Sequence, residues 1–210
     1  NGYKVKVLNT INFKKSMHYN PFSYVHSEKD ILKLVTTLMT NTKGEGSGGD
    51  PFWEKSERLL LTALIAYLHY EAPVEEQNFA TLLEMLNTMQ VLEDDEEYQN
   101  PVDLLFEELA KKKPDHPAVK AYQRYRGGPD ETIRSVIMTV NARMQPFDNE
   151  ELLEIFSSND IPLDEFGVGI DGDKKTKSNL FIIIPDDDDT FNFVPGMVYT
   201  LLFQELYRQA

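Results

Sequence analysis

The sequence predicts a mostly helical chain, in which a block of helices is inserted between two ends that share one small α/β unit. The chain opens with a strand-like alternation and returns near its end to a short apolar run followed by an amphipathic helix. The long stretch between these ends has helical periodicity and repeated helix start signals. The net negative charge is confined to this stretch, since residues 28–165 hold 28 acidic and 13 basic side chains.

The charge distribution predicts two bodies, because the remaining residues hold 7 acidic and 8 basic side chains and are nearly neutral. We expect residues 1–27 and 166–210 to form the α/β core and residues 28–165 to form an acidic, all-helical insert. With 210 residues, of which 41% are hydrophobic, the chain can bury a core. The absence of cysteine excludes disulfides and thiolate metal sites. A net charge of −14 argues against a large nucleic-acid surface, because such surfaces are built from Lys and Arg.

The first elements follow from local pattern. Tyr3, Val5 and Val7 alternate with polar residues, which predicts a half-buried strand. Asn20-Pro21 then interrupts the chain. Ser27 is expected to cap a helix that carries its apolar side chains on one face, namely Ile31, Leu34, Val35, Leu38 and Met39.

The glycine-rich segment 43–49 is interpreted as a flexible linker, because it lacks the Gly-Lys-Ser/Thr order of a phosphate-binding loop. Asp50-Pro51 is expected to start a long helix, about 51–70, that is buried over much of its surface. We assign Phe52 and Trp53, near its start, to the core.

Five further helices are expected before residue 165. Asn78 and Asn100 are the predicted N-caps of two of them, the second being followed by Pro101 and Asp103. Prolines and glycines delimit a short helix that contains Tyr122 and Tyr125. Asp130 is the expected cap of a longer helix that ends near Pro146, and Asp148 with Glu151 predicts a capping box for another.

The last segment changes character. Leu180–Ile184 is a continuous apolar run with three isoleucines, which predicts a strand covered on both faces. Pro185 and four aspartates close this run, and an amphipathic helix is expected after Pro195. A strand followed by a helix is half of a βαβ unit, so the N-terminal strand is expected to join the same sheet.

Two acidic runs are candidate sites. A solvated loop is the simpler interpretation of the first run, and a docking patch for a basic partner is the alternative, with Glu93, Asp94, Asp95, Glu96 and Glu97 as the candidate residues. The second run, Asp186–Asp189, follows a strand and could hold Mg²⁺ through carboxylate oxygens, although a solvated turn explains it more simply.

No residue is assigned a catalytic, cofactor-binding or metal-binding role from the sequence. The histidines have no metal-ligand spacing and are expected to be structural, namely His18, His26, His69 and His116. The arginines are expected to pair with local acids rather than to hold phosphate, namely Arg124, Arg126, Arg134 and Arg143. The lysines at 111–113 and at 174, 175 and 177 are too few to form a tight DNA groove.

Several stretches in collinear order resemble a known family. The first are Gly2-Tyr3-Lys4-Val5, Val7-Leu8-Asn9, Tyr19-Asn20-Pro21-Phe22, Asn41-Thr42, Asp50-Pro51-Phe52-Trp53-Glu54, Glu57 and Leu59-Leu60. The later ones are Thr132, Ser135-Val136, Arg143, Phe147, Phe181-Ile182-Ile183-Ile184-Pro185-Asp186, Asp188 and Thr190-Phe191-Asn192-Phe193. The ordered set resembles the TraG-like coupling-protein ATPases of conjugation and type IV secretion.

The resemblance implies an all-helical bundle inserted in a partial α/β, RecA-like sheet. It further implies a hexameric ATPase at the cytoplasmic face of the bacterial inner membrane, using ATP and Mg²⁺. Such a protein would pass relaxase–DNA complexes or protein substrates to the secretion channel. The helical domain would recruit those substrates.

The nucleotide-binding motifs of this family are expected upstream of Gly2 and downstream of Ala210, and the membrane-anchoring helices are also missing from this sequence. We therefore expect this chain to be a fragment that does not hydrolyse ATP alone, since phosphoryl transfer would lack its phosphate cradle and its magnesium-holding acid. The fragment itself is expected to hold no cofactor, to touch DNA only indirectly and to make no membrane contact. The alternatives are a stand-alone helical protein-interaction module and a metal-dependent enzyme that uses Asp186–Asp189.

Overall fold

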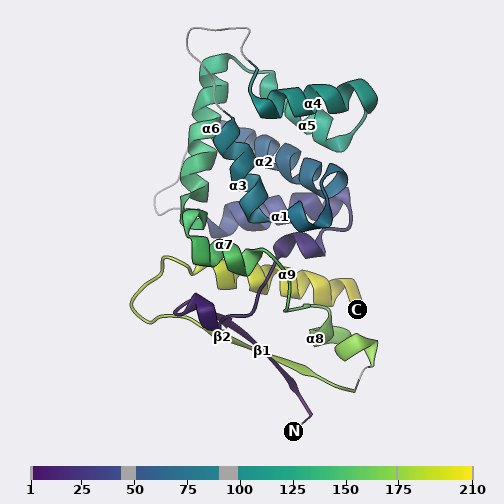
Figure 1. Cartoon of the computed structure of the whole chain (residues 1–210), viewed down its shortest axis with the longest axis vertical. Coiled ribbons are helices and arrows are strands. Elements are labelled where there is room, and N and C mark those ends of the chain that lie inside the picture. The colour runs from purple at the N-terminus through teal and green to yellow at the C-terminus, as the bar shows by residue number, and fades with distance from the viewer. Residues whose placement is uncertain (1, 44–50, 90–98, 174, 210) are drawn as a thin grey trace.

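The computed structural model describes residues 2–43, 51–89, 99–173 and 175–209, and it confirms a mostly helical fold with a partial sheet (Figure 1). Within these ranges the strands are β1 (Lys4–Asn9) and β2 (Ser178–Ile183). The helices are α1 (Glu28–Asn41), α2 (Pro51–Glu71), α3 (Phe79–Thr88), α4 (Pro101–Lys112), α5 (Pro117–Arg126), α6 (Asp130–Met144), α7 (Glu150–Phe156), α8 (Glu165–Val168) and α9 (Phe193–Gln209).

The two strands lie side by side below the helices in Figure 1. They pair in parallel, with Lys4 opposite Ser178 and Asn9 opposite Ile183. This pairing confirms that the first strand joins the sheet of the last one. Parallel neighbours need a crossover connection, and here the helical body lies between them in the chain.

The sheet is covered on one face only, so the prediction of a strand buried on both faces is wrong. Leu8, Leu180 and Ile182 pack against the hydrophobic core. On the opposite face Val5, Phe181 and Ile183 are exposed, Phe181 to 54%. The physical reason is that, among the described residues, the hydrophobic core packs against only one face of the sheet.

The helix starts follow the predicted caps in three cases. The side chain of Ser27 accepts a hydrogen bond from the Asp30 N–H at the start of α1, and Asn78 accepts one from the Thr81 N–H at the start of α3. Asn100 and Asp103 form a reciprocal capping box at α4. These side chains occupy N–H groups that would otherwise lack a partner.

Three predicted boundaries are shifted. Asp130 is the first residue of α6 and follows Pro129, rather than capping the helix from outside. Asn149, not Asp148, caps α7 by accepting the Leu152 N–H, because Asp148 belongs to a preceding short 3-10 helix. Helix α9 begins two residues before Pro195, whose ring is tolerated in a first turn.

Phe52 and Trp53 are exposed to 51% and 36%, so their assignment to the core is wrong. The first turn of α2 projects beyond the helices that cover the rest of it, and burial begins at Glu57. From Leu60 to Leu68 the helix is largely buried, as its composition predicts.

The centre of the core is a group of aromatic rings from distant segments. Phe147 lies 4.6 Å from Phe79, 5.6 Å from Phe156 and 4.9 Å from Phe193, measured between ring centroids. Tyr19 adds a contact with Phe156 at 6.3 Å. These contacts cross the boundaries at residues 27 and 165, and the division into separate domains stays a prediction.

A polar tether joins β1 and the segment after it to the end of the helical body. The side chain of Asp160 accepts hydrogen bonds from the His18 ring at 2.7 Å and from the His18 N–H at 3.2 Å. The Nζ of Lys6 donates to the Asp160 carbonyl at 2.7 Å. The hydrogen bond from the His18 side chain is the largest of the influences that lower the pKa of Asp160.

The Asp160→Asn substitution is expected to lower the free energy of unfolding at neutral pH by at most ~1 kcal/mol, because the carboxylate is half exposed. A lowered folded-state pKa means that the carboxylate contributes stability above its unfolded pKa of ~3.9 and loses it as the pH falls through the folded value. The difference from the wild type should therefore narrow between about pH 5 and pH 3 in urea unfolding experiments. Asp187→Asn, in an exposed turn, is the matched control. A pH-independent difference would contradict this expectation.

Candidate functional site

The candidate patch of Glu93, Asp94, Asp95, Glu96 and Glu97 lies outside the described residues, so it stays a prediction. Asp186–Asp189 lies in an exposed turn after β2. Asp188 accepts hydrogen bonds from the side chain and the N–H of Thr190, which lower its pKa. In the parts of the chain that the structure describes, no group of three or more His, Asp or Glu side chains is placed to hold a metal ion.

The histidines that make side-chain contacts have structural partners. His18 is bound to Asp160, as above. His116 accepts the Ala118 N–H through Nδ1 and so caps α5. The ring of Tyr70 lies 4.7 Å from that of His69 and 5.2 Å from that of His116.

The ion pair of Arg143 is more buried than that of Arg126. Its Nε donates to the carboxylate of Glu57 at 2.6 Å, and the side chain of Glu57 is only 5% exposed. The Nη1 of Arg143 also donates to the carbonyls of Met39 and Thr42 at the end of α1. One guanidinium therefore joins α6, α2 and α1.

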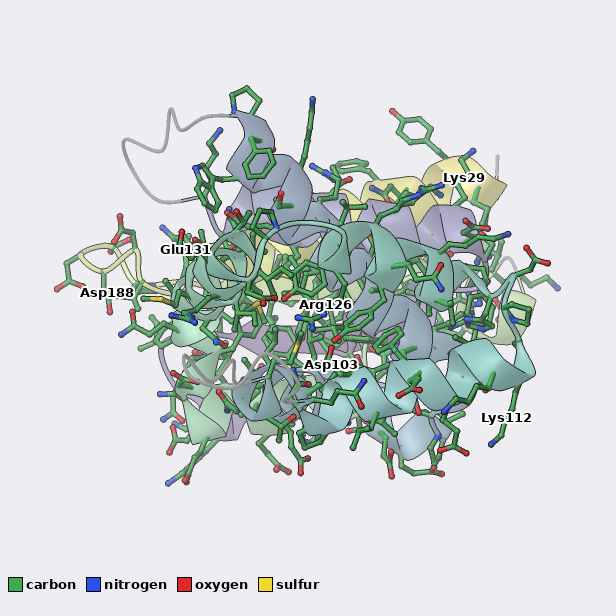
Figure 2. All side chains as sticks on the ribbon, turned by 90° about the horizontal axis from the view of Figure 1, so that it is seen from above. Lys29, Asp103, Lys112, Arg126, Glu131 and Asp188 are labelled. Carbon is green, nitrogen blue, oxygen red and sulfur yellow. The ribbon has the colours of Figure 1, made fainter. Side chains whose placement is uncertain are left out.

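A second buried network fixes α5 on α4. The Tyr122 hydroxyl donates to Asp103 at 2.7 Å, and Arg126 approaches the same carboxylate at 3.3 Å (Figure 2). Burial, and then the hydrogen bond to Asp103, raise the pKa of Tyr122, so the hydroxyl remains a neutral donor. Phe106 stacks on Tyr122 with 3.9 Å between ring centroids. Ion pairing with local acids was predicted for all four arginines and is confirmed for Arg126 and Arg143. For Arg124 the prediction is wrong among the described residues, because its guanidinium lines a surface hollow and forms no ion pair there.

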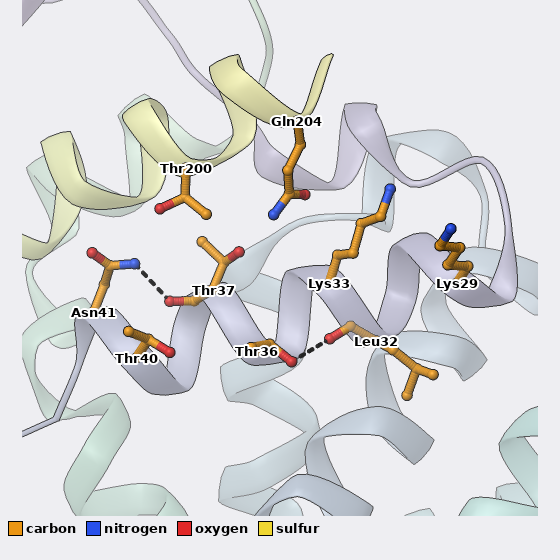
Figure 3. Close-up of a pocket in the computed structure, with 9 residues that line it drawn as sticks. All are labelled: Lys29, Leu32, Lys33, Thr36, Thr37, Thr40, Asn41, Thr200 and Gln204. Carbon is orange, nitrogen blue, oxygen red and sulfur yellow. Dashed lines mark hydrogen bonds between the residues drawn. The ribbon is translucent and has the colours of Figure 1, made fainter. Parts of the chain in front are cut away.

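A pocket of about 320 Å³ lies between α1 and α9 (Figure 3). Sequence reasoning missed it, because it depends on how α9 packs against α1. Its residues are Lys29, Leu32, Lys33, Thr36, Thr37, Thr40, Asn41, Thr200 and Gln204.

The polar groups of this pocket are mostly engaged by their own helices. The Thr36 hydroxyl donates to the Leu32 carbonyl, and the Asn41 amide donates to the Thr37 carbonyl. Lys33 pairs with Asp30 at 2.9 Å. None of these lining residues is an acid, so they form no acid–base pair for proton transfer among themselves.

Within the described residues the fold is a body of helices that packs on one face of a two-stranded parallel sheet. The family model for the type IV secretory system, conjugative DNA transfer, matches residues 1–209. The chain belongs to this family, and the resemblance inferred from its motifs is confirmed. A search of curated proteins finds no match. No helix in the described ranges is both long enough and apolar enough to cross a membrane.

Proposed function

We propose that this chain is the substrate-recruiting part of a coupling ATPase, which delivers relaxase–DNA complexes or protein substrates to a type IV secretion channel. The observation that carries the proposal is the family match over residues 1–209. The parent protein would bind ATP and Mg²⁺, assemble as a hexamer and sit at the cytoplasmic face of the bacterial inner membrane. The helical body would select the substrate.

The open sheet face supports a larger parent over a stand-alone helical module. Parallel strands are normally covered on both faces, and two strands alone form a marginal sheet. Here Phe181 and Ile183 are exposed on a two-stranded parallel sheet. Within the parent, further elements of the nucleotide-binding core would cover these side chains.

The charge of the helical body supports a basic partner. Residues 28–165 carry a net charge of −15, and an acidic face accelerates association with a basic protein. The attraction weakens as salt screens it. The acidic residues from Glu93 to Glu97 are the proposed contact residues for this partner.

Calorimetry with the relaxase of the same conjugative element tests this proposal. We expect binding at low salt that weakens as salt rises, because the contact is electrostatic. Neutralising the five acids at positions 93–97 to Gln or Asn should weaken binding about tenfold, whereas neutralising Asp186–Asp189 should not. Absence of binding at low salt, with the chain shown to be folded by circular dichroism, would refute the recruiting role.

A further inference from the structure

Two neighbouring hollows form one groove along α2. The first, about 480 Å³, lies between α1, α2 and α5, and the second, about 300 Å³, lies between α2, α5 and the start of α6. Lys55, Leu59 and Arg124 line both hollows, so the two hollows adjoin along α2 and α5. We call this feature the α2–α5 groove.

The floor of the α2–α5 groove is aliphatic. The aliphatic lining residues are Ile31, Leu32, Leu59, Ala66, Ala121, Ile133 and Val136, and Phe52 and Pro117 also line the groove. Leu32 is 47% exposed although it lies on a helix with a well-buried opposite face. Covering such side chains removes apolar surface from water and favours binding by about 25 cal/mol per Å².

Basic side chains line the groove, in a chain whose net charge is −14. They are Lys55, Arg58, Lys120 and Arg124, with Glu28 as the acidic lining residue.

These cations are available to a ligand. Arg58 and Lys120 pair with Glu54 at 3.7 Å and Asp115 at 3.0 Å. Those two carboxylates are well exposed, so both pairs contribute little and can be exchanged. Within the described residues, Lys55 and Arg124 form no ion pair.

Tyr125 lies at one end of the groove. Tyr125 lines the second hollow and is only 5% exposed, yet its hydroxyl has no hydrogen-bond partner among the described residues. Burial raises the pKa of Tyr125, so the hydroxyl stays a neutral donor. Tyr125 therefore contributes to the lining of the second hollow.

We propose that the α2–α5 groove binds an acidic peptide segment of a partner protein. Apolar side chains of the segment cover the aliphatic floor, and its carboxylates meet the four cations. The identification of this partner as a transferred substrate rests on the proposed function. Peptide binding itself is inferred from the apolar lining and the cations of the groove. The groove selects charge of the opposite sign to that selected by the acidic face, so the two surfaces would read different parts of one partner.

The lining favours a peptide over single-stranded nucleic acid. Nucleic-acid channels present aromatic faces on which bases stack. Here Phe52 is the exposed ring that lines the groove, and it meets the ring of Trp53, outside the lining, edge to face with 5.4 Å between centroids and an interplanar angle of 80°. The other apolar lining residues of the groove are mostly aliphatic. The overall charge of −14 also repels a phosphate chain.

Fluorescence anisotropy on the full chain tests the groove with a synthetic amphipathic peptide of about 14 residues, carrying Leu at helical spacing and Glu elsewhere. The double variant Lys55→Glu and Arg124→Glu should weaken binding about tenfold or more. The double variant Lys175→Glu and Lys177→Glu has the same charge change at exposed positions away from the groove and should bind like the wild type. Leu32→Gln should also weaken binding, without loss of stability.

Three further ligands test which kind of molecule the groove binds. A peptide with Leu replaced by Ala and one with Glu replaced by Lys should both bind more weakly than the acidic amphipathic one. An oligothymidylate should not compete with it. Equal binding by the Lys55→Glu, Arg124→Glu variant, no peptide binding by folded wild type, or tighter oligothymidylate binding would each overturn the proposal.

The two proposals can fail separately. If the acidic peptide binds in the groove but the relaxase does not bind at all, the recruiting role fails and the groove stands. If the relaxase binds wild type and the Lys55→Glu, Arg124→Glu variant equally, while no acidic peptide binds, the groove fails and the recruiting role stands.

Discussion

Arg143→Ala is expected to lower the free energy of unfolding by about 3–5 kcal/mol, because it leaves the Glu57 carboxylate buried without its charge partner. Glu57 is 4% exposed, so water cannot replace the guanidinium without local opening. The substitution also removes the donor to the carbonyls of Met39 and Thr42 at the end of α1. Urea unfolding followed by circular dichroism measures the change.

The matched control for this change is Arg124→Ala, which removes a guanidinium without an ion pair among the described residues and should alter stability by less than ~0.5 kcal/mol. The double variant Glu57→Leu, Arg143→Met should be more stable than Arg143→Ala alone, because no unpaired charge remains. If Arg143→Ala and Arg124→Ala lowered the free energy of unfolding by the same small amount, the buried ion pair would not hold the three helices together.

Elements defined by local chemistry were predictable from the sequence. Ser27, Asn78 and Asn100 cap helices within two or three residues of themselves, and no distant part of the chain is needed for those hydrogen bonds. The pairing of β1 with β2 required one further step, since it followed from interpreting the last strand and helix as half of a βαβ unit.

Features that depend on packing between distant elements were not predictable. Phe52 and Trp53 are residue types typical of a core, but they lie in the first turn of α2, which the other helices leave exposed. Phe181 and Ile183 belong to an apolar run, and only the packing of the helices decides which sheet face is covered. The α2–α5 groove has lining residues on several helices, which the sequence separates by tens of positions.

The candidate sites that the sequence indicates differ from the one that the fold indicates. The acidic runs were visible as composition, whereas the basic groove was hidden because its cations lie in an acidic stretch. Lys55 and Arg58 are one helical turn apart, and Lys120 and Arg124 are another such pair. This spacing was the available signal, but it acquires meaning only when α2 and α5 pack together.

Phe147→Ala is expected to destabilise the whole chain by about 3–5 kcal/mol, a large share of the 5–15 kcal/mol typical of a domain. Phe147 is fully buried, and its ring touches rings from α3, α7 and α9. In the predicted division of the chain, Phe193 falls in the C-terminal α/β piece and Phe147 falls in the helical insert. Truncating this ring should therefore shift a single unfolding transition that both parts share.

Far-ultraviolet circular dichroism and tyrosine fluorescence, recorded through the same urea titration, test that coupling, since coincident transitions indicate cooperative unfolding. Phe203→Ala is the matched control, because Phe203 is 54% exposed on α9 and should change stability by less than ~0.5 kcal/mol. Two separate transitions in the Phe147→Ala variant, with one unchanged from the wild type, would show that the helical insert is independently stable. In that case the aromatic cluster would be a contact between two domains, and the charge-based division of the chain would describe its folding units.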